Sequence, residues 1–246
     1  MQSSKRRDNY SSVHSVDKFI LPLLEREIIC SLKEMVPHEH LSNQNLFLDV
    51  GCGNQPFRTN IEELGFTYRS LDIQQNVNKN VDFILAIDSP FDRPELLHEF
   101  NVILFSEVAE HVFDVKQAFL NLSKLLKAGG SLILTTPFVY GLHEEPNDYW
   151  RLTNYAIERF AKESGFEIVH AKKLGDGWDV LGTILGLNSI VPASNSFLSK
   201  MLAYFALKLR NLLWKCLSSD KFRSSVKFSE TNNSIYLSNF YVLRKV

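Results

Sequence analysis

The sequence predicts an α/β protein in which a doubly wound, mostly parallel sheet of seven strands is covered by helices on both faces. Short apolar segments alternate along the chain with longer segments whose apolar residues recur at helical spacing. This alternation is typical of parallel strands joined by crossover helices. The first short segment, Leu46–Val50, is almost continuously apolar, as expected of a strand that is buried on both faces.

The elements follow one another at spacings that suit this fold. Strands are expected at residues 46–50, 68–71, 81–86, 102–105, 131–136, 166–169 and 235–243, and helices at 16–36, 58–64, 113–126 and 153–164. Gly129-Gly130 is the expected stop after the third helix, because glycine readily adopts the left-handed conformation that ends helices. Thr153 is the expected N-cap of the fourth, since its hydroxyl can accept an N–H of the first turn.

The chain is expected to form one domain. Residues 1–15 are polar and include Lys5-Arg6-Arg7, and we expect a flexible arm there rather than a secretory signal. Residues 16–246 are expected to form a single domain with a helical insertion at about residues 178–230. No apolar run approaches the roughly 20 residues of a membrane-spanning helix.

Composition excludes some classes of function. The chain of 246 residues has 27 basic and 28 acidic residues, so a concentrated basic face and a nucleic-acid partner are not expected. Cys30, Cys52 and Cys216 are far apart and form no Cys-x-x-Cys pattern. A disulfide scaffold or zinc site is therefore not expected, and a cytoplasmic location is.

Unusual residues follow the first two predicted strands. Gly51 and Gly53 come directly after the first strand, where the lack of a Cβ lets the backbone turn and approach a ligand. Asp72 ends the second strand, 23 residues after Asp49, and an acidic side chain there can accept hydrogen bonds from both hydroxyls of a ribose. Ligands of open α/β sheets bind at this edge.

A dinucleotide-binding loop has a similar layout and is one alternative. Its Gly-x-Gly-x-x-Gly pattern places a third glycine where this chain has Pro56. The charge of Asp49 would oppose a nearby pyrophosphate but can attract a cationic amino group. A nicotinamide oxidoreductase is therefore disfavoured, and an ordinary tight turn without a ligand is the other alternative.

Five segments, in order, resemble the motifs of the class I S-adenosylmethionine-dependent methyltransferases, in particular the type 11 group. They are Leu48–Gly53, Ser70–Ile73, Ala86–Phe91, Phe105–Val112 and Leu125–Leu132. The first departs from the common form because it lacks a third glycine near Asn54 or Gln55. The resemblance implies a Rossmann-like methyltransferase fold with S-adenosylmethionine as the cofactor.

The resemblance also implies roles for the methionine side of the cofactor. Gly51 and Gly53 would pass beneath the methionine part, and Asp49 would reach its amino group, directly or through water. Ser106 and Glu107 would line the side of the sulfonium.

For the adenosine side, the resemblance implies four residues. Asp72 would hold the ribose, with Ile73 beside the adenine. Asp88 would bind the adenine amino group, and Ile87 would offer backbone contacts. A helix or turn cap is the alternative for Asp88, and a solvated strand end is the alternative for Asp72.

The acceptor side is expected where strands four and five end. If residues 107–111 are helical, Glu107, Glu110 and His111 share one face. This Glu-x-x-Glu-His run resembles one that holds a divalent metal in quinone-pathway O-methyltransferases. We favour the alternative in which Glu110 and His111 are structural and no metal is bound.

The run from Pro137 to Thr153 resembles a stretch of type 11 proteins that are associated with bacterial surface-glycan pathways. His143 is the candidate general base, because its reference pKa near 6.5 suits proton transfer. His111 and Glu107 are further catalytic candidates. Tyr149 and Trp150 are candidates for a sugar-stacking wall, and Asp148 and Arg151 for a pair that fixes the loop.

Two classes of function are compatible with these features. The first is methyl transfer to an oxygen, or secondarily a nitrogen, of a small-molecule or glycan-like, lipid-linked acceptor. The second is a non-catalytic binding or scaffold module that retains the fold. The sequence does not predict the oligomeric state.

The insertion has a basic, amphipathic segment at residues 195–227. Its apolar residues Leu198, Met201, Leu202, Phe205, Leu209, Leu212, Leu213 and Cys216 fall on one stripe of a helical wheel. We favour a cap over the acceptor pocket, with Leu207 and Trp214 buried against the segment that precedes it. The alternative is a peripheral contact with the inner membrane surface.

Overall fold

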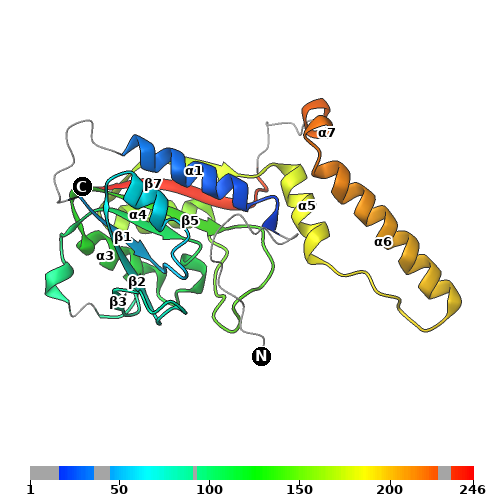
Figure 1. Cartoon of the computed structure of the whole chain (residues 1–246), viewed down its shortest axis with the longest axis horizontal. Helices are drawn as coiled ribbons and strands as arrows, with labels where there is room; N and C mark the ends of the chain where they lie inside the picture. Colours follow the sequence, from blue (N-terminus) through cyan, green and yellow to red (C-terminus); the bar gives the residue numbers. More distant parts are fainter. Residues whose placement is uncertain (1–16, 36–44, 91–92, 227–233) are drawn as a thin grey trace.

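A seven-stranded sheet, in the order β3-β2-β1-β4-β5-β7-β6, forms the centre of the computed structural model (Figure 1). The model describes residues 17–35, 45–90, 93–226 and 234–246. The strands are β1 (Leu46–Val50), β2 (Thr67–Asp72), β3 (Phe83–Ile84), β4 (Phe100–Ser106), β5 (Leu126–Pro137), β6 (Phe166–Leu174) and β7 (Ser238–Lys245). Only β7 runs antiparallel to its neighbours. The predicted mostly parallel sheet is therefore confirmed, and the predicted arm at 1–15 lies outside the described residues.

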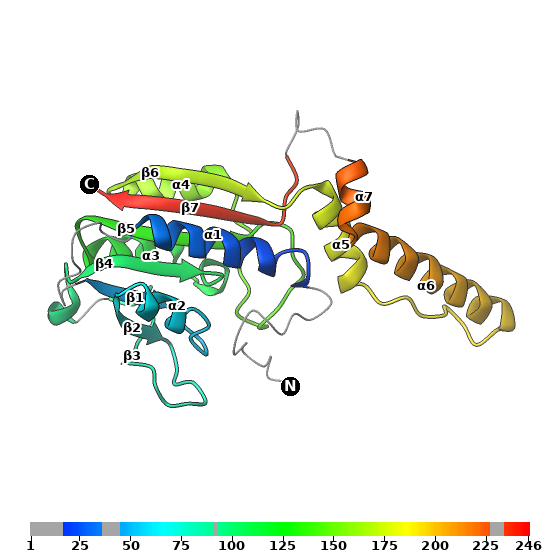
Figure 2. The ribbon, with the colours of Figure 1, turned by 45° about the horizontal axis from the view of Figure 1, so that its top comes forward.

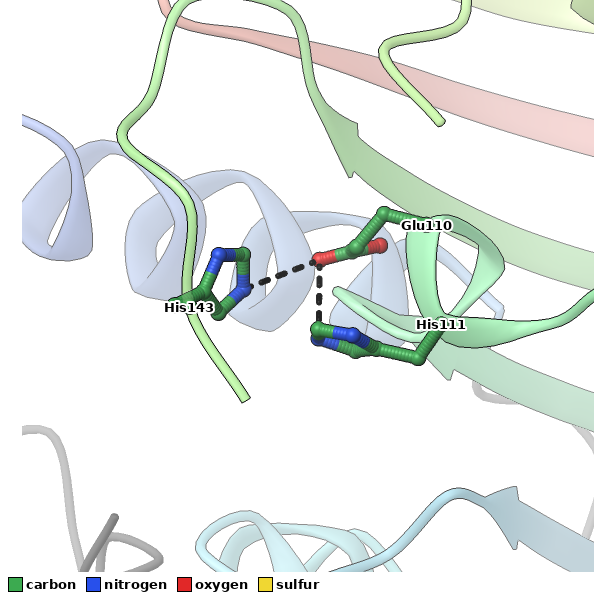
Figure 3. A group of neighbouring side chains, drawn as sticks. All are labelled: Glu110, His111 and His143. Atoms are coloured by element: carbon green, nitrogen blue, oxygen red, sulfur yellow. Dashed lines mark ion pairs between the residues drawn. The ribbon is translucent and has the colours of Figure 1, made fainter. Parts of the chain in front are cut away.

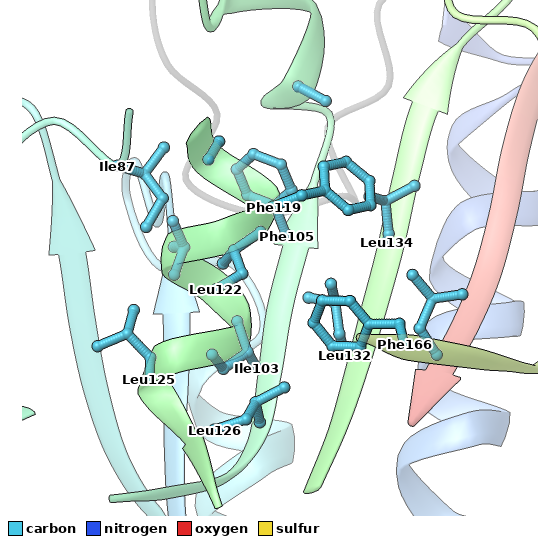
Figure 4. Close-up of a cluster of buried hydrophobic side chains, with 14 of the residues drawn as sticks. Ile87, Ile103, Phe105, Phe119, Leu122, Leu125, Leu126, Leu132, Leu134 and Phe166 are labelled. Atoms are coloured by element: carbon cyan, nitrogen blue, oxygen red, sulfur yellow. The ribbon is translucent and has the colours of Figure 1, made fainter. Parts of the chain in front are cut away.

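Helices cover both faces of the sheet. The helices α1 (Leu21–Glu34) and α2 (Arg58–Glu63) pack on one face, and α3 (Val115–Leu125) and α4 (Asn154–Glu163) pack on the other. Because side chains of a strand alternate between faces, Ile103 and Phe105 of β4 join the cluster under α3 (Figure 4), whereas Val102 and Leu104 join the cluster under α1. This double coverage leaves the strand ends as the places for polar groups.

Two predicted elements differ from the structure at their ends. The helix predicted at 113–126 ends at Leu125, before Gly129-Gly130, because the N–H groups of His98 and Glu99 bind its last carbonyl groups. Leu126 is already extended and pairs with Phe100, so β5 begins there.

The third strand is shorter than predicted. Only Phe83 and Ile84 of the predicted 81–86 pair with β2. The reason lies in Asp82, whose carboxylate accepts the backbone N–H of Ser70 at 2.9 Å and its hydroxyl at 2.6 Å. The side chain of Asp82 thereby takes a place that a strand carbonyl would otherwise occupy.

The described part of the insertion, up to residue 226, forms three helices, α5 (Gly177–Leu187), α6 (Phe197–Leu217) and α7 (Asp220–Ser225). The C-terminal end of α6 packs on α5, and the rest of α6 extends away from the sheet in both views (Figures 1 and 2). Within the described part of the chain, no helix is both long and apolar enough to cross a membrane.

The base of the insertion is fixed to the start of α1. Gly182 of α5 lies against the ring of Phe19, and a Cβ at Gly182 would lie 2.4 Å from Cζ of that ring. Phe19 also makes an edge-on contact with Trp214 of α6, with 5.7 Å between ring centroids. Both Gly182 and Phe19 are buried, so neither can move without disturbing the other.

We expect Gly182→Ala to lower the free energy of unfolding by about 1–3 kcal/mol, because overpacking at Phe19 outweighs the helix propensity gained. Chemical denaturation monitored by circular dichroism measures this change. Leu181→Ala, at the exposed neighbouring position, is the control and should have a smaller effect. A Gly182→Ala variant as stable as the wild type would contradict the packing described here.

Candidate active site

A cavity of about 380 Å³ opens at the carboxyl ends of β1, β2, β4 and β5. It brings together seven of the eight predicted cofactor residues and all three predicted catalytic residues. These are Gly51, Gly53, Asp72, Ile73, Ile87, Asp88, Ser106, Glu107, His111 and His143. α6 contributes no described residue to the lining, so the predicted cap over this pocket is wrong. Leu207 and Trp214, which that prediction expects to be buried, are half-buried, and Trp214 packs against Phe19 at the base of the insertion.

Sequence reasoning missed the contribution of the first helix. Ile20, Leu21 and Leu24 at the start of α1 line the cavity, as does Asp17. The hydroxyl of Tyr140, in the loop after β5, donates a hydrogen bond to Asp17. The helical periodicity of this segment gave no signal that one end of its apolar face borders a ligand site.

The lining has one sign of charge. Apart from two histidines, its titratable side chains are Asp17, Asp72, Asp88, Glu107, Glu144 and Tyr140, together with Cys52. No lysine or arginine of the described residues lines the cavity. Such a lining attracts a cationic ligand and opposes a pyrophosphate, which counts against the dinucleotide alternative.

The loop after β1 is held open toward the cavity. Gly51 has a φ of 70°, and a Cβ there would lie 2.4 Å from Cγ2 of Val108. Gly53, with a φ of 51°, donates its N–H to Oδ2 of Asp72 at 3.0 Å. Both glycines therefore occupy left-handed positions, and at Gly51 only glycine fits between the backbone and Val108.

The predicted adenosine residues lie together on the β2 side. The carboxylate of Asp72 also accepts the N–H of Gln74 at 3.3 Å, so it holds two loop segments at once. Ile73 lines the cavity and is 63% exposed, which leaves an apolar surface for a flat ring. Oδ2 of Asp88 accepts the N–H of Asp114 at 3.3 Å, so Asp88 lines the cavity and also stabilises a turn.

Hydrogen bonds from α3 and β5 fix the segments that carry Ile87 and Ser106 to the cavity. Nδ2 of Asn121, in α3, donates to the carbonyl of Ile87 at 2.7 Å. The hydroxyl of Ser106 bonds that of Thr135 at 2.8 Å. These two contacts hold the ends of the segments that reach the cavity.

Asp49 is the predicted cofactor residue that the structure does not place in the lining. It is buried beneath the loop, where Oδ2 accepts the hydroxyl of Tyr68 at 2.7 Å. Burial, reinforced by the charge of Asp72, raises the pKa of Asp49 to about 7 despite the hydrogen bond from Tyr68. A direct contact with a ligand amino group therefore needs a path through the loop, and this role stays a prediction.

The segment 107–111 is not helical, so the predicted shared face is wrong. Glu107 has a φ of 54°, and only Ala109–His111 forms a single 3₁₀ turn, η3. The carboxylate of Glu107 turns toward β7 and accepts the hydroxyl of Ser238 at 3.0 Å. Burial, together with the charge of Glu110, raises the pKa of Glu107 to about 8.

Glu110 lies between two histidines (Figure 3). Its Oε1 is 3.7 Å from Nε2 of His111 and 3.7 Å from Nε2 of His143, and the two imidazole rings meet edge-on with 4.7 Å between centroids. The carboxyl group is fully buried, and neither of its oxygens has a hydrogen-bond partner among the described residues. A buried carboxylate in this state needs a positive neighbour, which a protonated imidazole can supply.

The loop after β5 presents His143 to Glu110. Its backbone N–H is donated to Oδ2 of Asp148 at 2.9 Å, and Nδ1 lies 3.2 Å from the carbonyl of Gly141. Arg151 binds Asp148 through both terminal nitrogens, at 2.6 and 2.8 Å, so the predicted pair that fixes the loop is present. Burial lowers the pKa of His143, but the negative charges of Glu110 and Asp148 outweigh it and raise the pKa above the ordinary value.

The predicted wall of Tyr149 and Trp150 is wrong, because neither residue lines the cavity. Nε1 of Trp150 donates to the carbonyl of Val112 at 2.9 Å, and Tyr149 packs edge-on against Phe113. Both rings are therefore used to attach the loop to the turn after β4.

Among the described residues, Glu110, His111 and His143 form the one group with metal-ligating atoms close together, within 4.8 Å of one another. One carboxylate and two imidazoles suit a divalent transition metal. Glu107 is not in this group, so the Glu-x-x-Glu-His run does not assemble as its sequence resemblance implies.

Comparison with known proteins places these features in a family. A family model described as a methyltransferase domain matches residues 24–171. The ubiquinone biosynthesis O-methyltransferase of Rickettsia bellii is 33% identical over 100 residues, which are 36% of this chain and 40% of that protein. The mitochondrial protein of the same name from Homo sapiens is 26% identical over 141 residues, which are 52% of this chain and 38% of that protein. The matched regions thus span about two fifths of these relatives.

A solved structure has the same fold. Phosphoethanolamine N-methyltransferase 2 of Haemonchus contortus, in complex with S-adenosyl-L-methionine, aligns with a TM-score of 0.52 and 18% identity, over 89% of this chain and 52% of that chain. The family model spans more than half of the chain and contains the cavity-lining segments from Gly51 to His143. The chain therefore belongs to the methyltransferase-domain family and has the fold of the class I S-adenosylmethionine-dependent methyltransferases.

Proposed function

We propose that this protein binds S-adenosylmethionine and transfers its methyl group to an oxygen of a small-molecule acceptor, including a glycan-like or lipid-linked one. The position of His143 carries the proposal, because its imidazole lines the same cavity as Gly51 and Asp72 and lies beside the buried Glu110. The curated relatives are named as O-methyltransferases of ubiquinone biosynthesis, which supports oxygen as the acceptor atom.

S-adenosylmethionine supplies an electrophilic methyl group on a sulfonium. The acidic lining favours a ligand with this charge, and Asp72 would hold its ribose. His143 takes the acceptor proton on Nε2 as the oxygen attacks, while Nδ1, facing the carbonyl of Gly141, keeps its own. The charge of Glu110 then stabilises the imidazolium that forms.

Glu107 and His111 support this arrangement. With a pKa of about 8, Glu107 is largely neutral at pH 7, so it adds little negative charge beside Glu110 and can orient an acceptor hydroxyl by hydrogen bonding. His111 lies against the other side of Glu110, and Nδ1 of His111 is 2.7 Å from the carbonyl of Asn147. We assign it a positioning role for the carboxylate.

The alternative is a binding or scaffold module that retains the cofactor but has no turnover. The acid-lined cavity with an imidazole at its acceptor side favours the enzyme, since binding alone does not need a base. A panel of phenols, sugars and lipid-linked alcohols, assayed for methyl transfer from labelled cofactor, separates the two. Cofactor binding without transfer to any member would favour the module.

Asp72→Asn should weaken binding of S-adenosylmethionine by at least about tenfold, because a charged acceptor of two ribose hydrogen bonds is worth about 1.5–3 kcal/mol. Asparagine keeps an oxygen for the N–H of Gly53 and loses only the longer contact with the N–H of Gln74, so the loop after β1 should survive. Isothermal titration calorimetry with S-adenosylmethionine and S-adenosylhomocysteine measures the affinity. Glu62→Gln, on the exposed side of α2, is the control. An unchanged affinity of the Asp72 variant would refute its ribose role.

Glu110→Gln should lower the pKa of His143, because it removes a nearby negative charge that raises this pKa. Ring resonances of ¹⁵N-labelled histidine, assigned with a His143→Ala variant, follow this titration without any acceptor. The ascending limb of turnover against pH should move to lower pH in the same variant, since the base must be neutral. His143→Ala should reduce turnover by about 10²-fold or more while cofactor affinity is retained. A pH profile that Glu110→Gln leaves unmoved would count against this pairing.

We expect methyl transfer to need no metal, because Glu107 does not join Glu110, His111 and His143 as the resemblance to a metal-binding run implies. Treatment with EDTA should change turnover less than about twofold. In enzymes that depend on a metal, even the mutation of a residue that supports the metal ligands typically lowers activity about tenfold or more. Activity that EDTA abolishes and added Zn²⁺, Mg²⁺ or Mn²⁺ restores would instead assign Glu110, His111 and His143 as ligands.

A further inference from the structure

The helix α6 has three distinct sides. The side that packs is marked by half-buried or buried residues at intervals of three and four, namely Ser199, Ala203, Leu207, Arg210, Trp214 and Leu217. At 100° per residue, Lys200, Lys208 and Lys215 lie along one flank of this side. The remaining side carries the apolar stripe that the sequence predicted.

The apolar stripe is exposed along the whole helix. Leu198, Met201, Leu202, Phe205, Leu209, Leu212 and Leu213 are between 37% and 60% exposed. Large contiguous apolar patches on a protein surface mark a contact with a protein, a ligand or a membrane. The helix α6 extends away from the sheet in both views (Figures 1 and 2).

The charge of α6 indicates which kind of partner fits. The helix contains Lys200, Lys208, Arg210 and Lys215 but no acidic residue. A second copy of the chain packed stripe to stripe would bring lysine flanks together without acidic partners. An anionic lipid surface instead attracts the lysines, which can extend to the headgroups while the stripe enters the acyl boundary.

Several contacts join the helices of the insertion to one another and to the start of α1. Nη1 of Arg223 binds Oδ1 of Asp179 at 2.6 Å, which joins α7 to α5, and Nη1 of Arg210 donates to the carbonyl of Asn188 at 3.0 Å. The Nζ of Lys18 lies 4.9 Å from the ring centroid of Trp214. The insertion is therefore fixed to the residues at the start of α1.

The same insertion borders the acceptor loop. The side chain of Leu187, at the end of α5, lies over Gly141, two residues before His143. A surface that holds α6 is thus connected, through α5, to the loop that carries the candidate base.

We propose that α6 docks along the surface of an anionic lipid bilayer through its apolar stripe, with Lys200, Lys208 and Lys215 at the headgroups. The helix lies on the bilayer and does not cross it, because its charges are spread along its length. Docking holds the acceptor loop near the lipid surface. It does not depend on the methyl-transfer chemistry.

The test is co-sedimentation of the full chain with phosphatidylcholine vesicles, with and without phosphatidylglycerol. We expect binding that needs phosphatidylglycerol and falls as salt is raised. Lys200→Glu/Lys208→Glu/Lys215→Glu should weaken it by at least about tenfold. The variant Leu202→Gln/Phe205→Gln/Leu209→Gln should abolish binding to the vesicles, because glutamine keeps the helix propensity and removes the apolar stripe.

The matched control is Lys33→Glu/Lys124→Glu/Lys162→Glu, which makes the same change of charge at exposed positions on α1, α3 and α4. It should bind vesicles more tightly than the α6 triple variant. Calorimetry with S-adenosylmethionine, run on every variant, separates a failure of docking from a failure of the cofactor site. A wild-type chain that stays in the supernatant at low salt overturns the proposal. So does a dimer in analytical ultracentrifugation that the glutamine variant converts to monomer, because the stripe would then belong to a second copy.

Discussion

The structure depends on the burial of its central strands on both faces. β1, β4 and β5 are covered by apolar side chains above and below, so a charged group within them loses its hydration on either side. Polar side chains are therefore confined to the strand ends, and the carboxyl ends of the parallel strands meet at one edge. The cavity and its acidic lining follow from this constraint, because that edge is where the chain can place its carboxylates.

Much of this arrangement is predictable because it depends on local pattern. Apolar runs identify the strands, and the glycines after β1 and Asp72 at the end of β2 identify the edge of the sheet that carries the cavity. Glu107 was harder to place, since a left-handed residue directly after β4 breaks the helix that its neighbours suggest. The pairing of Glu110 with His143 joins two loops 33 positions apart, and no spacing rule predicts it.

The insertion marks a second limit of sequence reasoning. Periodicity separates the sides of α6 but does not say which side another element covers. The stripe with the most apolar residues would ordinarily be buried, yet the side of Leu207 and Trp214 packs instead. Contacts with Phe19, far away in the sequence, decide this orientation. The helical character of the insertion could be predicted from the sequence. The side of α6 that faces the rest of the protein could not, because it depends on such long-range packing.

The clustered acids connect stability to cofactor binding. Asp49 and Glu107 have pKa values of about 7 and about 8, both raised chiefly by burial above their ordinary values. The folded chain therefore holds protons that the unfolded chain would release, so these two groups reduce stability as pH rises from about 4 toward 8. A bound cation reverses the balance, since a nearby positive charge favours the ionised carboxyl groups. The clustering of carboxylates lowers the stability of the folded chain, and a cationic ligand offsets this loss when it binds. The same clustering favours a sulfonium over an anionic cofactor, because the negative lining attracts the first and repels the second.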